Sequence, residues 1–297
     1  TASRYLKKDG LPKAIITCQG LTYNYLFSFW VAESRIKGTP LYIAQHGGVY
    51  GECEPNGIGE EYLERKISDS FLSWGWSDKN VIALDSMKRL SIAASIISRM
   101  KPKKYDILII TTHASLVVSS YFGMYGYKLF DYYAHQERVI KILLEAGFNK
   151  IYLRAYPGKE AAAIKLLALN ERIELVDTKQ NILLQMSRSK LVLFDYLGAS
   201  SFIDSLRLNI PSLLVYDDNI SQIRKSAREN YELAEEAKIV MNISKFKRNL
   251  IDIKQQGISV WWHSEPCLSL KMAFTKKQYG FGEKYLKKWR NFLESIS

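Results

Sequence analysis

Residues 191–218, LVLFDYLGASSFIDSLRLNIPSLLVYDD, constrain the fold more than any other stretch of the chain. The apolar run 191–194 predicts a buried strand, and small, turn-forming residues fill 195–201. Residues 202–208 have helical spacing, Pro211 ends that helix, and 212–216 predicts the next buried strand. This βαβ unit predicts a parallel sheet, and open α/β folds bind their ligands at the carboxyl ends of such strands.

The same alternation of strands and helices runs through the whole chain. Apolar runs predict strands at 14–18, 41–44, 81–84, 105–111, 151–154, 173–176, 191–194 and 212–216. Helical spacing predicts helices at 23–36, 60–66, 131–146, 159–169, 180–187, 202–208, 221–237 and 283–295. We therefore expect an α/β protein with a doubly wound parallel sheet. Turn residues after the aromatic segment 68–76 place a domain boundary near 76–80, which gives an N-terminal domain 1–76 and a C-terminal domain 77–297.

Charge and cysteine content narrow the functional classes. The formal charge of +12 implies an acidic partner, but the basic residues are scattered, which disfavours a nucleic-acid surface. An anionic membrane or a phosphate-bearing small molecule fits this scatter better. Three widely spaced cysteines suggest neither a disulfide framework nor a zinc cluster, so we expect a reducing cytoplasm. Apolar runs fall short of the ~20 residues that span a bilayer, which leaves peripheral contact with the inner face of the membrane open.

Common cofactor motifs are absent from the sequence. It contains no G-x-G-x-x-G that opens a helix, no G-x-x-x-x-G-K-[ST], no H-E-x-x-H and no C-x-x-C. Asp217 and Asp218 are the nearest approach to a metal-binding pair, but such a pair at a strand end is more often an ordinary turn. We therefore expect no cofactor and no catalytic metal.

Four loops at the carboxyl ends of predicted strands carry polar groups suited to an anionic ligand. The predicted binding residues in them are Gln45, Gly47, Gly48, Thr112, His113, Arg154, Lys159, Asp195, Tyr196, Gly198, Ser200, Ser201 and Asp204. Arg154 and Lys159 flank a Pro-Gly turn and suit a phosphate, although a solvated loop explains them equally well. Ser200 or Ser201 would cap a helix whose amino end faces the phosphate, or would be a cap alone.

His46 is the candidate general base. It follows a predicted strand and lies in the glycine-rich turn QHGGVYG, where close approach of a ligand is possible. A partly buried structural histidine is the alternative interpretation. If His46 is not the base, the carboxylates of Glu60, Glu61 and Asp69 are the next candidates.

Three stretches carry a family resemblance: QHGGVYG at 45–51, DSFLSWGW at 69–76, and FDYLGASSFIDSLRLNIPSLLV at 194–215. Together they resemble a family of bacterial surface-polysaccharide transferases with the GT-B glycosyltransferase fold. They are more distantly similar to transferases that use CMP-activated Kdo-type sugars. The resemblance covers about residues 12–218 and is weakest beyond 219.

The resemblance implies two Rossmann-like domains, with the nucleotide held by the C-terminal one and the acceptor by the N-terminal one. It also implies no obligatory metal, and it would place His46 on the acceptor side, opposite Arg154, Ser200 and Ser201. A complete N-terminal GT-B domain needs more strands than residues 1–76 supply. We therefore expect either a missing upstream segment or an unusually small acceptor half.

The expected function is transfer of a sugar from a nucleotide-sugar donor to a bacterial surface glycan or lipid-linked glycan. A CMP-linked Kdo or nonulosonate-type donor is favoured weakly over UDP and GDP sugars. A GT-B-like nucleotide-sugar epimerase or hydrolase is the alternative. A third possibility is a phosphate-binding module without catalysis.

Overall fold

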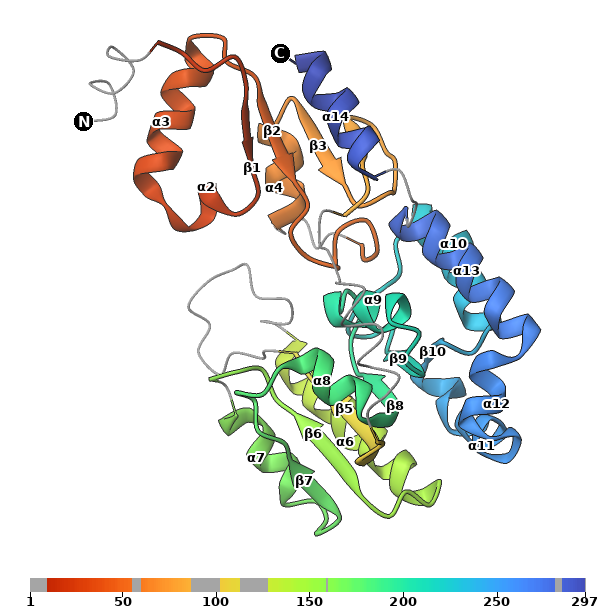
Figure 1. The fold of residues 1–297 in the computed structure, drawn as a ribbon. Helices are drawn as coiled ribbons and strands as arrows, with labels where there is room; N and C mark the ends of the chain where they lie inside the picture. Colours follow the sequence, from red (N-terminus) through yellow and green to blue (C-terminus); the bar gives the residue numbers. More distant parts are fainter. Residues whose placement is uncertain are drawn as a thin grey trace. The chain divides into compact units, whose positions relative to one another are not determined.

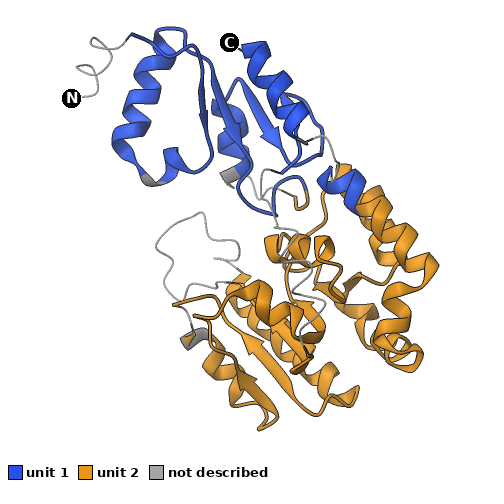
Figure 2. Cartoon of the chain, in the orientation of Figure 1, with its two compact units in different colours: residues 1–51, 55–88, 275–297 blue, residues 52–54, 89–274 orange. Residues whose placement is uncertain are grey.

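The protein consists of two α/β units, each built on its own parallel sheet. The computed structural model describes residues 10–54, 60–86, 102–112, 128–158, 160–280 and 285–296. The first unit comprises residues 1–51, 55–88 and 275–297, and the second comprises 52–54 and 89–274 (Figure 2).

The first unit contains a four-stranded parallel sheet in the order β1-β2-β3-β4 (Figure 1). Its strands are β1 (Ile15–Thr17), β2 (Leu41–Ala44), β3 (Ser70–Ser73) and β4 (Val81–Ala83), and its helices are α2 (Gly20–Tyr23), α3 (Tyr25–Ile36), α4 (Glu60–Ile67) and α14 (Tyr285–Ile296). Asn24 begins α3, because its side-chain oxygen accepts a hydrogen bond from the amide of Phe27 at 3.0 Å. The expected strand at 81–84 thus belongs to the first sheet, not to the second domain.

Two apolar layers hold this sheet. One cluster combines Ile15, Val31, Ile43 and Phe71 and includes side chains of α3. The other includes Phe292 of α14, which comes from the far end of the chain. The indole of Trp289 also donates to the carbonyl of Asp85 at 2.9 Å. The division of the chain therefore differs from the expected domains 1–76 and 77–297. The C-terminal helix joins the N-terminal unit because its apolar side chains pack against the sheet of that unit.

The second unit contains a six-stranded parallel sheet in the order β10-β9-β8-β5-β6-β7. Its strands are β5 (Tyr105–Ile110), β6 (Ile151–Arg154), β7 (Ile173–Leu175), β8 (Ser189–Phe194), β9 (Ser212–Tyr216) and β10 (Val240–Asn242). Its helices are α6 (Leu129–Glu145), α7 (Ala161–Leu167), α8 (Ile182–Ser187), α9 (Ser200–Arg207), η2 (Lys225–Ala227), α10 (Arg228–Glu236), α11 (Ile243–Gln256) and α12 (Ile258–His263), and α13 (Glu265–Tyr279) begins here and ends in the first unit. The predicted doubly wound parallel sheet is confirmed.

The strand order creates a switch point between β5 and β8. From β5 the chain moves outward to β6 and β7, then crosses back through α8 to β8 and moves the other way to β9 and β10. Right-handed crossovers in opposite directions put their helices on opposite faces, so the loops after β5 and β8 diverge. Ligands of doubly wound folds bind at such a point, outside the carboxyl ends of the strands.

One expected helix, 221–237, is shorter than predicted. Residues 222–224 instead lie extended against 52–54: the amide of Glu54 donates to the carbonyl of Gln222 at 2.9 Å, and that of Arg224 donates to the carbonyl of Glu52 at 2.8 Å. These backbone bonds compete with the helical ones, so helical structure starts only at Lys225.

Candidate functional site

The turn after β2 places His46 at the carboxyl edge of the first sheet. Its Nε2 lies 2.5 Å from the hydroxyl of Tyr50 and 3.3 Å from Oε1 of Glu64 on α4. Its Nδ1 lies 2.9 Å from the side-chain nitrogen of Gln19, which follows β1. Tyr50 also meets the imidazole edge to face and stacks on Phe71. The carboxyl ends of two neighbouring strands thus meet at one polar network.

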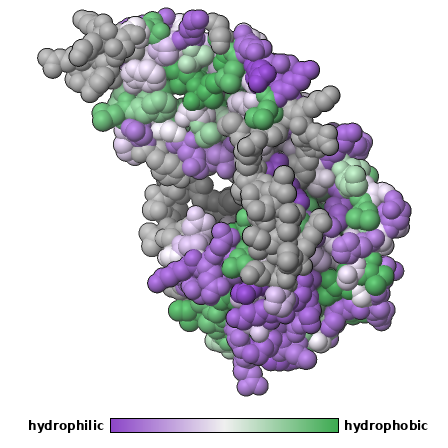
Figure 3. All heavy atoms as spheres, viewed as in Figure 1, coloured by the Kyte–Doolittle hydropathy of each residue, from purple (hydrophilic) through white to green (hydrophobic). Residues whose placement is uncertain are grey.

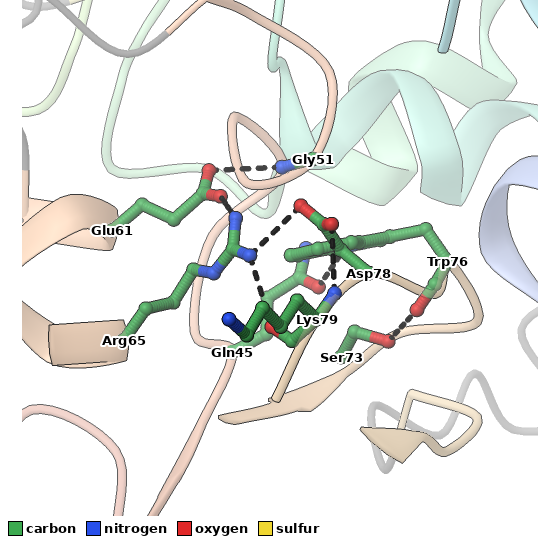
Figure 4. A network of polar contacts seen from close by, with 8 residues as sticks. All are labelled: Gln45, Gly51, Glu61, Arg65, Ser73, Trp76, Asp78 and Lys79. Atoms are coloured by element: carbon green, nitrogen blue, oxygen red, sulfur yellow. Dashed lines mark hydrogen bonds and ion pairs between the residues drawn. The ribbon is translucent and has the colours of Figure 1, made fainter. Parts of the chain in front are cut away.

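Gln45 holds the turn rather than presenting its amide outward. Its side-chain oxygen accepts from the indole of Trp76 at 2.9 Å (Figure 4). The same oxygen accepts from the amide of Trp74 at 2.8 Å, and the side-chain nitrogen donates to the carbonyl of Gly47 at 2.7 Å. Because the amide is buried and engaged on both sides, the structure gives Gln45 a structural role in place of the expected ligand contact.

Position 51, the last residue of the same turn, requires glycine for two reasons. Its φ is +73°, and a Cβ there would lie 2.4 Å from the ring of Trp76. Gly47 and Gly48 have no positive φ, and a Cβ on Gly47 would reach only ordinary contact with Tyr50. The resemblance motifs 45–51 and 69–76 are therefore two halves of one packing unit.

Two of the three alternative bases, Glu61 and Asp69, form hydrogen bonds with residues other than His46. The carboxylate of Glu61 accepts from the amide of Gly51 at 3.0 Å and pairs with Arg65 at 3.2 Å, which locks the turn (Figure 4). Asp69 precedes β3 at the opposite, amino edge of the sheet, where it accepts from Arg35 and from the amide of Leu41. The hydrogen bond from Arg35 holds the pKa of Asp69 below its usual value. The side chain of Glu60 lies outside the described residues.

Sequence reasoning missed Glu64, which is the carboxylate nearest His46. Glu64 is 6% exposed, and its Oε2 has no hydrogen-bond partner among the described residues. The signal was present but weak: Glu61 and Glu64 are three residues apart on α4, so they share a helix face. Only the packing of α4 beside the turn shows that this face meets His46.

In the second unit, polar groups meet at the switch point between β5 and β8. The carboxyl of Asp195, directly after β8, accepts from the hydroxyl of Tyr132 at 2.9 Å and from the amide of Gln136 at 2.7 Å. The amide of Thr112, after β5, donates to the same hydroxyl at 3.2 Å. Burial away from water raises the pKa of Asp195 to about 7, although the hydrogen bonds from Gln136 and Tyr132 oppose this. Burial also raises the pKa of Tyr196.

The loop 195–199 leads into α9 as expected, but no hydroxyl caps the helix. Gly198 has a φ of +79°, and Ala199 is the N-cap residue without a side-chain hydrogen bond. Ser200 and Ser201 form the first turn instead, and neither is buried. Asp204 is 2% exposed, so it does not reach out from the helix as predicted. The amino end of α9 remains the part of this loop that suits an anion.

The side chain of Arg154 is buried and forms hydrogen bonds within the protein. Its buried guanidinium donates to the side chain of Gln185, to the carbonyl of Thr178 at 3.0 Å and to that of Asp177 at 3.4 Å. It therefore ties the loop after β7 to α8, and the phosphate contact that the sequence predicted for Arg154 stays a prediction. Lys159 and His113 lie outside the described residues.

No cluster of three or more His, Cys, Asp or Glu side chains suitable for a metal occurs in the described ranges. Among the same residues, no helix has the length and apolarity needed to cross a bilayer.

Solved structures share this fold at low sequence identity. A pneumococcal O-GlcNAc transferase, GtfA, solved with UDP and GlcNAc, has a TM-score of 0.60 at 12% identity, and the match covers 99% of this chain and 59% of that one. A UDP-GlcNAc 2-epimerase from Methanocaldococcus jannaschii has a TM-score of 0.55 at 10% identity, with 99% and 78% coverage. HepE from Anabaena, solved with UDP and glucose, has a TM-score of 0.54 at 10% identity, with 99% and 80% coverage.

Two α/β units with parallel sheets, matched over nearly the whole chain by such structures, define a GT-B fold. Residues 1–293 match the LIC12162 family transferase profile, and the chain belongs to this family of transferases. No curated protein sequence matches it.

Proposed function

We propose that the protein is a glycosyltransferase that uses a nucleotide-sugar donor and needs no metal. Membership of a transferase family and the GT-B fold support the reaction class. The observation that carries the proposal is the pair of polar networks, one at the carboxyl edge of each sheet. The His46 network offers a base, and the network around Asp195 at the switch point, beside the amino end of α9, offers a place for a nucleotide.

The donor belongs to the second unit in this proposal. The first amides of α9 are suited to the donor phosphate because a helix amino end carries partial positive charge. Thr112 and Tyr196 lie at the same switch point and are suited to the nucleoside. Arg154 supports this edge indirectly, through the loop at 177–178. The solved complexes of similar fold with UDP support a nucleotide as ligand.

The chemistry requires one proton transfer and one bond exchange. The acceptor hydroxyl oxygen bonds to the anomeric carbon, and the bond from that carbon to the donor phosphate breaks with its electrons on the phosphate. His46 accepts the hydroxyl proton, a step that an imidazole performs near neutral pH. The phosphate leaves with the nucleotide, so no external oxidant or reductant is needed.

A CMP-linked Kdo or nonulosonate-type donor is our preferred choice within the nucleotide sugars, on the sequence resemblance alone, and a bacterial surface glycan is the preferred acceptor. A thermal-shift panel of CMP, UDP, GDP and their sugars, each with and without EDTA, tests the donor and the metal independence. A ligand at ~100 times its Kd adds about 2.7 kcal/mol to the free energy of unfolding. Stabilisation that disappears with EDTA would contradict metal independence.

A nucleotide-sugar epimerase or hydrolase is the second candidate, and the similarity in fold to the UDP-GlcNAc 2-epimerase favours it. The two functions differ in their need for an acceptor. Donor consumption without an acceptor would select the second candidate, whereas nucleotide binding without turnover would leave a binding module.

We further propose that the first unit contacts an anionic membrane, where a lipid-linked acceptor would be presented. Tyr25, Leu26, Phe29 and Ile36 of α3 are between 67% and 81% exposed, and Figure 3 shows apolar residues at the surface of this unit. The net charge of +12 adds attraction to acidic headgroups.

A further inference from the structure

The two ring nitrogens of His46 face different surroundings. Nε2 points at Tyr50 and Glu64, which are 2% and 6% exposed, whereas Nδ1 points at the exposed side chain of Gln19. The inner nitrogen is therefore enclosed by protein, whereas the outer nitrogen faces an exposed side chain.

These partners determine which nitrogen carries the proton. An ionised carboxylate only accepts hydrogen bonds, so Glu64 requires Nε2 to be the donor. The hydroxyl of Tyr50 can donate or accept and does not decide the matter. On the other side, the side-chain nitrogen of Gln19 donates, so Nδ1 must be the acceptor. One tautomer, with the proton on Nε2, satisfies both contacts.

Glu64 has capacity beyond this contact. Oε2 of Glu64 is buried and has no hydrogen-bond partner among the described residues. Within that part of the chain, no other cation therefore neutralises the carboxylate at this oxygen. Its charge reaches the end of β1, where it helps to raise the pKa of Cys18, although burial of the thiol is the larger cause. A carboxylate in this position stabilises an imidazolium that forms beside it.

We propose that Glu64 is a positioning residue that holds His46 in the Nε2–H tautomer, and that Nδ1, which Gln19 occupies, is the atom that accepts the proton of the incoming hydroxyl. The acceptor hydroxyl replaces the amide of Gln19 as the donor to Nδ1. When the proton moves from oxygen to Nδ1, the imidazolium keeps its Nε2–H bond to Glu64, and no proton passes to the carboxylate. The role of Nδ1 rests on the proposed function, whereas the tautomer does not.

The tautomer is measurable on the full chain without any substrate. With ¹⁵N-labelled histidine, a long-range ¹H–¹⁵N correlation spectrum distinguishes a protonated from an unprotonated ring nitrogen. The chain has four histidines, and the signals that disappear in His46→Asn identify those of His46. We expect protonated Nε2 and unprotonated Nδ1 above the pH at which the ring is charged. A protonated Nδ1 in the wild-type protein would overturn the proposal.

Variants then separate Glu64 from its neighbours. Glu64→Gln should shift His46 toward the Nδ1–H tautomer, because the new amide can donate to Nε2. Tyr50→Phe should leave the tautomer unchanged, and so should Glu61→Gln, the matched change one helical turn away. If Tyr50→Phe shifts the tautomer and Glu64→Gln does not, Tyr50 fixes the ring and the assignment of Glu64 is wrong. The wild-type spectrum and Tyr50→Phe still decide the question if Glu64→Gln does not fold.

Turnover tests the catalytic half separately. Glu64→Gln should lower kcat by about 10²–10⁴-fold, the range for a misplaced acid–base group, with nucleotide affinity unchanged. Normal kcat in a variant whose tautomer has shifted would overturn the role of Nδ1. An absence of transferase activity in the wild type would remove the proposed function and the role of Nδ1 with it, while the tautomer result would stand.

Discussion

The indole nitrogen of Trp76 donates to the side-chain oxygen of Gln45 across 31 residues of sequence, at 2.9 Å. The amide of Trp74 donates to the same oxygen at 2.8 Å, so one buried glutamine joins two stretches that look like separate motifs in the sequence. This link keeps the turn that carries His46 in place.

Gln45→Ala should lower the free energy of unfolding by about 2–5 kcal/mol. The change leaves the amide of Trp74 and the indole of Trp76 without their acceptor, and each buried unsatisfied donor costs about 1–3 kcal/mol. Urea unfolding measures the loss. Gln180→Ala, at an exposed glutamine, is the matched control and should change stability by less than about 0.5 kcal/mol. Equal losses in the two variants would contradict the structural role of Gln45.

Gly51→Ala should destabilise the protein more than Gly158→Ala. Both glycines have a positive φ, +73° and +77°, so both variants have the same left-handed strain of about 1–2 kcal/mol. Only the Cβ at position 51 would lie 2.4 Å from Trp76, whereas nothing lies within 4 Å at position 158. Chemical denaturation of the pair isolates the clash. Matching free energies of unfolding would show that the ring of Trp76 moves away without cost.

Asp195 should make the folded state less stable as pH rises. Its folded pKa, about 7, lies above its unfolded value, so the folded state holds a proton that the unfolded state has lost between about pH 4 and 7. Relative to wild type, Asp195→Asn should therefore gain about 3 kcal/mol between pH 4 and pH 7. Urea unfolding across this range tests the sign. A difference that does not change with pH would show that Asp195 is ionised when folded.

His135 should make the folded state less stable as pH falls. Burial lowers its pKa to about 4, partly offset by the nearby charge of Asp217, so the unfolded state binds the extra proton between about pH 4 and 6.5. Stability from this residue is thus lost as pH falls, and His135→Gln should gain about 3 kcal/mol over wild type at pH 4 relative to pH 6.5. The stability difference between variant and wild type should rise with pH for Asp195→Asn and fall with pH for His135→Gln. A change in the same direction for both variants would contradict this account.

The exposed face of α3 should bind anionic vesicles. Replacing Leu26 and Phe29 with Ser removes apolar area that would enter the interface, and sedimentation with phosphatidylserine-containing vesicles should then recover less protein. Val260→Ser, at an exposed apolar position of the second unit, is the control and should bind like the wild type. Equal recovery of both variants would exclude α3 as the contact.

Much of the fold could be predicted because its signals are local. The run YDILII at β5 is apolar and bounded, and it pairs with β6 and β8 in the centre of the sheet. β3 and β10 were missed because SFLS and VMN are too short to show a pattern, and they become strands only through pairing with β2 and β9. The attachment of α14 to the first sheet depends on Phe292 and Trp289 meeting residues about 200 positions earlier, which no local pattern shows.

The candidate site was predicted less completely. The strand pattern correctly placed His46 and Asp195 at the carboxyl edges of the two sheets, since topology alone brings such residues there, and their roles stay predictions. The strand pattern could not show that the side chains of Arg154 and Gln45 form hydrogen bonds to neighbouring segments, because those bonds depend on side-chain direction. Glu64 was missed for the same reason, as helix register and packing together decide that it faces His46.

The most direct test of the proposed function is quantitative release of nucleotide from a panel of CMP-, UDP- and GDP-sugars, with and without a bacterial surface-glycan fraction as acceptor. We predict release from one donor only when acceptor is present, and a loss of about 10²–10⁴-fold in a His46→Asn variant that remains folded. Release that does not depend on acceptor, or near-normal turnover in a folded His46→Asn variant, would contradict a glycosyltransferase in which His46 is the base.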